Sequence, residues 1–124
     1  MGFADRLIIV NRYEPQDGMA AFVAAVTALA RRVEAEGHRG VLSYRFFAAV
    51  EARAVVTYAS PEAWMGHHDI AFGWPEMAAL HATARLVEVN IHGPFPEAMR
   101  AWLDRSGLLA RIIHHGAAVA GFDR

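Results

Sequence analysis

Several residues of this 124-residue chain are of types that can bind or transform a small aromatic molecule: Asn11, Trp64, His67, His68, Trp74 and His81. A neutral imidazole can accept a proton near neutral pH because its ordinary pKa is about 6.5. Asparagine and tryptophan donate hydrogen bonds without titrating, and aromatic rings stack on a flat ligand. In one dry pocket, such side chains would favour the phenolate or enolate form of a bound molecule and stabilise the oxyanion that develops.

Each of these residues also has a structural interpretation. Asn11 stands in an apolar strand face, where an unpaired amide would cost about 1–3 kcal/mol, so it either faces a pocket or pairs with backbone at the end of the strand. His67 and His68 are adjacent, and their side chains point about 100° apart on a helix. Only one of them is therefore expected to face the sheet, and a surface or interface position is the alternative for each.

Four further aromatic side chains are expected to contact a ligand less directly. Tyr44 and Tyr58 lie on predicted strands and either line the pocket or pack normally in the sheet. Trp74 follows a glycine and precedes a proline, so it either binds substrate or plugs the end of the core. We also include His81 among the substrate-binding candidates.

Composition and motifs disfavour several classes of function. The chain has no cysteine, which excludes disulfides, thiolate metal sites and cysteine nucleophiles. No two of its seven histidines are three or four residues apart, so we predict no metal site. The net charge of −1 gives no field that would recruit a nucleic acid. Phosphate-binding loops, Gly-x-Gly-x-x-Gly and Gly-x-Ser-x-Gly are absent from the sequence.

The amino-terminal residues have no signal-peptide pattern, and the apolar stretch 19–30 is too short to cross a bilayer. We therefore expect a cytoplasmic protein with no membrane partner.

The hydrophobic periodicity predicts the order β-α-β-β-α-β within residues 1–95. Strands are expected at 6–13, 40–50, 53–58 and 85–91, and helices at 17–36, 60–72 and 75–83. This order describes a ferredoxin-like α+β sandwich with an antiparallel sheet. In it, the second helical region lies over the sheet and brings the candidate residues together.

Both faces of the first strand are apolar. Alternation places Leu7, Ile9, Asn11 and Tyr13 on one face and Ile8, Val10 and Arg12 on the other. Helices cover only one face of a two-layer sandwich, so we expect the other face to pack against the sheet of a second copy. The sequence thus predicts a homodimer.

Residues 96–124 form a carboxyl-terminal extension beyond this unit. Two short helices are expected there, at 97–104 and 108–115. The segment is too apolar for a free tail, and we expect it to dock on its own domain or on the partner subunit.

The sequence resembles the antibiotic biosynthesis monooxygenase-type family of dimeric α/β-barrel proteins over residues 5–95. The resemblance is carried by Ile9-Val10-Asn11-Arg12 through Gly18 to Phe22, by Val56 through Trp64, and by His67. It implies two sheets packed into a barrel, with a pocket between helices and sheet in each subunit. Some members oxygenate polycyclic phenolic substrates without metal or cofactor, and a related branch degrades haem with an Asn, a Trp and a His.

The resemblance favours His67 over His68 as a base, with Asn11 and Trp64 as hydrogen-bond donors to substrate oxygen. Asn11 matches the strand-one asparagine of the haem branch, whereas His67 falls where that branch has its tryptophan. The expected function is cofactor-independent oxygenation of an aromatic or polyketide-like molecule. The alternatives are a non-catalytic dimer that binds a small apolar ligand, and a haem-binding monooxygenase.

Overall fold

The computed structural model describes residues 2–124. One five-stranded sheet has the order β2-β3-β1-β4-β5. The elements are, in chain order, the 3-10 helix Phe3–Asp5, β1 (Leu7–Pro15), α1 (Met19–Glu36), β2 (Val41–Phe47), β3 (Ala52–Tyr58), α2 (Pro61–Ala71), α3 (Pro75–Thr83), β4 (Ala84–His92), α4 (Glu97–Ser106), the 3-10 helix Leu109–Arg111 and β5 (Ile112–His114). The first four strands pair antiparallel, and β5 pairs parallel with β4. The predicted α+β class and the ferredoxin-like βαββαβ order are confirmed.

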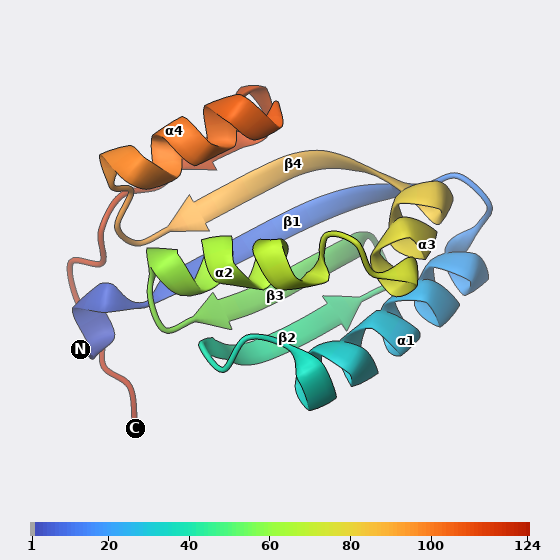
Figure 1. The fold of residues 1–124 in the computed structure, drawn as a ribbon, viewed down its shortest axis with the longest axis horizontal. Coiled ribbons are helices and arrows are strands. Elements are labelled where there is room, and N and C mark those ends of the chain that lie inside the picture. The colour runs from blue at the N-terminus through green and yellow to red at the C-terminus, as the bar shows by residue number, and fades with distance from the viewer. Residues whose placement is uncertain (1) are drawn as a thin grey trace.

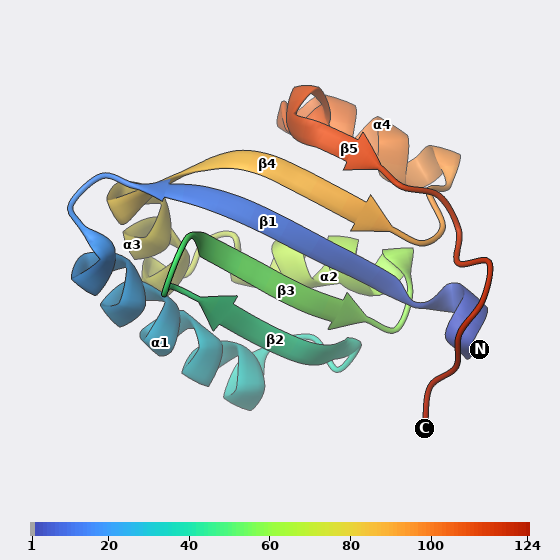
Figure 2. The same ribbon diagram turned by 180° about the vertical axis from the view of Figure 1, so that it is seen from behind.

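The helices lie on one face of the sheet and leave the other face open, as the two views in Figures 1 and 2 show. The covered face of β1 carries Leu7 and Ile9, which are buried, as alternation predicts. The apolar stripe of α1 packs onto this face through its buried residues Phe22, Ala25, Val26, Leu29 and Val33. Val23, expected in that stripe, is instead 44 % exposed.

Glycines stand at both ends of α1. Gly18 occupies the N-cap position, with a φ of 88° that favours glycine. Gly37 ends the helix in an extended conformation. At the start of α2, the Ser60 hydroxyl accepts a hydrogen bond from the backbone N–H of Ala63, and Pro61 follows it.

A register shift between Arg12 and Tyr13 changes which residues of β4 face the helices. Leu86 pairs with Tyr13 and joins the covered face, although strict alternation grouped it with Glu88 and Asn90. A similar register shift occurs in β2. It leaves Leu42 49 % exposed, whereas Tyr44 lies on the covered face. Simple period-two counting does not anticipate such bulges.

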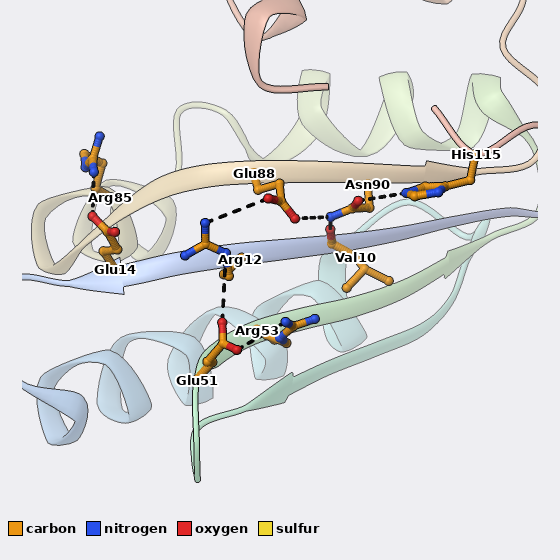
Figure 3. Close-up of polar contacts among 9 residues, drawn as sticks. All are labelled: Val10, Arg12, Glu14, Glu51, Arg53, Arg85, Glu88, Asn90 and His115. Carbon is orange, nitrogen blue, oxygen red and sulfur yellow. Dashed lines mark hydrogen bonds and ion pairs between the residues drawn. The ribbon is translucent and has the colours of Figure 1, made fainter. Parts of the chain in front are cut away.

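The open face of the sheet combines apolar side chains with a chain of paired polar ones. Figure 3 shows Arg12 between Glu51 and Glu88, with nitrogen–oxygen distances of 3.9 and 3.8 Å. Asn90 donates to Glu88 at 2.8 Å and accepts a hydrogen bond from His115. Ile8, Phe47 and Ile113 are exposed.

The segment after β4 docks on its own chain in the structure. Met99 and Leu103 of α4 are fully buried in the core. The helix expected at 108–115 is wrong, since this stretch forms a 3-10 turn and then β5 beside β4. Pairing with an otherwise free sheet edge outweighs the local helical pattern.

Candidate functional site

A cavity of about 370 Å³ lies between the covered face of the sheet and the helices α2, α3 and α4. Its lining is mostly apolar and aromatic. The side chains that can form hydrogen bonds are Asn11, Tyr13, Tyr44, Tyr58, Trp64, His67, His68, Asp69, His81, Trp102 and Ser106. An apolar pocket with a few polar groups is the usual form of a small-molecule site.

Seven of the eight predicted site residues line this one cavity: Asn11, Tyr44, Tyr58, Trp64, His67, His68 and His81. Trp74 does not. It caps the start of α3, and the Arg32 guanidinium lies 4.4 Å from its ring centroid. Arg32 also pairs with Glu76 at 2.9 Å, so Trp74 belongs to the contact between α1 and α3.

His67 is the most enclosed polar side chain of the cavity, with 1 % of its surface exposed. Its ring centroid lies 5.4 Å from that of Tyr44 and 5.8 Å from that of Tyr58. Its Nδ1 atom is buried and has no hydrogen-bond partner within residues 2–124. Burial, with a smaller contribution from the charge of His38, lowers the pKa of His67 to about 4. The imidazole is therefore neutral at pH 7.

His68 also lines the cavity, but its ring contacts are with helix residues, whereas His67 contacts the tyrosines of the sheet. The ring of His68 lies 5.9 Å from Trp64 and 5.5 Å from Trp102. Burial, followed by the charges of His67 and His81, lowers its pKa to about 3. The side of α2 that would otherwise meet solvent is covered by α4, and this brings both histidines into the site.

Asn11 supplies a second unpaired polar atom. Its amide nitrogen donates to the Tyr13 hydroxyl at 3.4 Å, whereas its Oδ1 is buried without a partner among the described residues. The predicted alternative, pairing with the backbone, is not what the structure shows. Buried polar atoms are normally satisfied, so Asn11 and His67, which both line the cavity, each retain one unused hydrogen-bonding atom.

The three tyrosines of the cavity are held in the protonated form. Burial raises the pKa of Tyr13 to about 12 and raises those of Tyr44 and Tyr58 above their usual value of 10. Their hydroxyl groups can therefore donate hydrogen bonds at neutral pH. The site offers neutral donors, neutral imidazoles and stacking surfaces.

Sequence reasoning missed Tyr13 and Trp102. Tyr13 shares the alternating face of Asn11, so the strand pattern could have identified it. Trp102 comes from the carboxyl-terminal extension, and its ring lies 5.3 Å from that of Trp64. Nothing in the local sequence signals that long-range contact.

A wider hollow of about 630 Å³ lies between α1 and β2. Tyr44 is the one predicted site residue in its lining. His38 lines it too and packs its ring against Gly66, where a Cβ atom would lie 2.7 Å from the imidazole. The other predicted site residues, apart from Trp74, line the cavity of about 370 Å³.

The cavity residues do not fit haem well. The lining contains no arginine or lysine that could pair with the two propionates. Among residues 2–124, no three His, Cys, Asp or Glu side chains lie close enough together to hold a metal ion. In the same range, no helix is long and apolar enough to cross a membrane.

No protein-family model and no curated protein sequence matches the chain. Among solved structures, it is similar to MupZ from Pseudomonas fluorescens, with a TM-score of 0.75, 18 % identity and coverage of 97 % of this chain and 95 % of that one. It is also similar to SnoaB, a cofactor-independent oxygenase from Streptomyces nogalater (TM-score 0.59, 16 % identity, 75 % and 96 % covered). A third similar structure is a Caulobacter crescentus protein assigned provisionally to the antibiotic biosynthesis monooxygenases (TM-score 0.62, 22 % identity, 77 % and 94 % covered).

These similarities concern the arrangement of strands and helices around the cavity. The chain has the ferredoxin-like fold of the antibiotic biosynthesis monooxygenase-type proteins.

Proposed function

We propose that the protein is a cofactor-independent monooxygenase that oxidises a flat, electron-rich aromatic molecule of the anthrone type. The observation that carries the proposal is that Asn11 and His67, each with one buried polar atom that has no partner among the described residues, line one mostly apolar cavity. The similarity in fold to a cofactor-independent oxygenase supports the same reaction class.

The reaction balances without an external reductant. An anthrone CH₂ group is oxidised to C=O by four electrons, and O₂ takes these electrons, leaving one oxygen atom in the product and one in water. His67 removes a proton from the CH₂ group, and the resulting enolate transfers an electron to O₂. The substrate radical and superoxide combine to a peroxide anion, which takes the proton back from the His67 imidazolium. The hydroperoxide then loses its remaining C–H proton and hydroxide as water, leaving the new C=O. The mostly apolar lining around His67, which is itself 1 % exposed, limits the contact of the anion with bulk solvent.

The neutral residues have distinct roles in this proposal. His67 is the base, and although its pKa is low in the free protein, a bound enolate beside it stabilises the imidazolium and raises that pKa. Asn11 and Trp64 bind substrate oxygen. Tyr44 and Tyr58 flank His67 at ring distances of 5.4 and 5.8 Å and keep its orientation.

A second function, binding of a small apolar ligand without catalysis, is favoured by one observation. A pKa of about 4 makes His67 a weak base before a ligand arrives. Fold alone does not separate a binding protein from an enzyme. Oxygen consumption separates them.

The experiment measures O₂ uptake with 1,8-dihydroxyanthrone, using an oxygen electrode and protein treated with a chelator. We expect uptake above the rate in buffer, and a loss of at least about 100-fold in kcat for His67→Gln, which keeps a polar side chain but cannot act as the base. His92→Gln is the matched control because His92 lies on the opposite face of the sheet. If the wild type binds the anthrone without consuming O₂, the oxygenase proposal is refuted and the ligand-binding function remains.

We further propose that the protein is a homodimer formed through the open face of the sheet. Ile8, Phe47 and Ile113 expose apolar surface there, and the charges of Arg12 are already paired with Glu51 and Glu88. Self-paired charges reduce the cost of covering that face. An exposed apolar patch on a sheet is typical of an interface between copies.

A further inference from the structure

The segment that follows β4 supplies one wall of the cavity. Trp102 and Ser106 of α4, together with Leu108 just beyond it, all line the cavity. Figure 1 shows α4 at the β4 edge of the sheet, on the same side as α2, and Figure 2, seen from behind, shows β5 in front of α4 at that edge. The βαββαβ unit alone would leave this side of the cavity without these three side chains.

The wall is firmly attached to the rest of the chain. Met99 and Leu103 of α4 are fully buried, while β5 extends the sheet by pairing with β4. Gly107 turns the chain with a φ of 78°, and the Leu108 N–H then bonds back to the carbonyl of Leu103. This turn returns Leu108 to the cavity.

Within the wall, Trp102 makes the closest ring contacts. Its centroid lies 5.3 Å from Trp64 and 5.5 Å from His68, both on α2. The indole thus closes the space between α2 and α4 and covers His68. A ligand bound beside His67 cannot extend in that direction without displacing this ring.

The structural comparisons separate two groups of proteins by this feature. MupZ is matched over 97 % of this chain, whereas SnoaB and the Caulobacter protein are matched over 75 % and 77 % of it although nearly all of their own length is covered. About a quarter of this chain therefore has no counterpart in the shorter proteins, which is about the share that follows β4.

We infer that this carboxyl-terminal wall, and Trp102 in particular, sets the length of ligand that the site accepts. The inference rests on the proposed function for the chemical class of the ligand. A cavity of about 370 Å³ is near the lower end of ligand sites. The closed wall selects molecules of two or three fused rings over those of four.

The test measures binding, so that it does not depend on turnover. The uncharged probes 1,8-dihydroxyanthraquinone and a four-ring analogue, a dihydroxytetracenequinone, are titrated into the wild-type protein and into Trp102→Ala by isothermal calorimetry. We expect the wild type to bind the three-ring probe at least about 10-fold more tightly, and Trp102→Ala to reduce that preference to about threefold or less. Trp102→Leu, with an intermediate side chain, should lie between them.

Trp74→Ala is the matched control, because Trp74 contacts Arg32 and lies outside the cavity lining. It should keep the wild-type preference, and circular dichroism verifies that each variant is folded. An unchanged preference in folded Trp102→Ala and Trp102→Leu would overturn the inference. Failure of the wild type to bind the three-ring probe would also overturn it. Neither result decides the oxygenase proposal, which O₂ uptake with 1,8-dihydroxyanthrone tests separately.

Discussion

The low pKa of His67 predicts that the protein loses stability on mild acidification. A histidine with a pKa of about 4 in the folded chain and 6.5 in the unfolded chain binds its proton more readily when unfolded. Its contribution to stability is therefore complete above pH 6.5 and falls as the pH decreases from 6.5 to about 4. Below that pH the loss is complete.

The magnitude follows from the difference between the two pKa values. At pH 4.5, the unfolded state gains about 2–3 kcal/mol from protonating this residue, since each pH unit below 6.5 corresponds to about 1.4 kcal/mol. This is a large part of the 5–15 kcal/mol that stabilises a typical domain. His68 titrates in the same direction, but it is present in both proteins compared below.

The assay is urea unfolding of the wild type and His67→Phe at pH 7 and pH 4.5, at one fixed protein concentration. Phenylalanine keeps a ring between Tyr44 and Tyr58 and removes the titrating group. We expect the wild type to lose about 2–3 kcal/mol more than the variant between the two pH values. An equal loss in both proteins would show that His67 is not held neutral by burial and would refute the reasoning.

Three further predictions concern other positions. Asn11→Val should raise the free energy of unfolding by about 1 kcal/mol, because it removes the unpaired Oδ1, and should weaken binding of 1,8-dihydroxyanthraquinone at least 10-fold. A less stable variant with intact affinity would contradict this. Gly93→Ala should lower the free energy of unfolding in urea by about 3 kcal/mol, since φ is +130° and a Cβ would lie 2.5 Å from the Arg6 carbonyl oxygen. Gly116→Ala, where φ is +91° and the space is open, should lower it by about 1 kcal/mol. Equal losses would show that the contact with Arg6 is unimportant. Val10→Arg, on the open face of the sheet, should convert the dimer to a monomer in size-exclusion chromatography, whereas the control Val23→Arg on α1 should not. A Val10→Arg protein that stays dimeric would place the interface elsewhere.

The fold could be predicted because its signals are local. The alternation in β1, the apolar stripe of α1 and the Ser60-Pro61 start of α2 each need only a few neighbouring residues. The bulge that turns Leu86 inward and the pairing of β5 with β4 depend on strands far apart in sequence. Such register shifts and edge pairings leave no local pattern.

The candidate site was predictable in part for the same reason. Asn11 and His67 stand on elements whose facing surfaces follow from periodicity and from the family resemblance. The inward position of His68 does not follow, since it results from Trp102 covering a helix face that would otherwise be solvated. Trp74 lies outside the cavity lining because the helical break before α3 directs it toward Arg32, which its local sequence does not signal.

The oxygenase proposal is tested most directly by turnover of 1,8-dihydroxyanthrone under ¹⁸O₂ with chelator-treated wild-type protein. Mass spectrometry of the quinone should show one labelled oxygen atom per molecule. In the control with ¹⁶O₂ and labelled water, the quinone should carry no label, provided that the new carbonyl is analysed before it exchanges with water. Quinone formed no faster than in buffer, or a new carbonyl oxygen that comes from water, would contradict the proposed chemistry of the cavity.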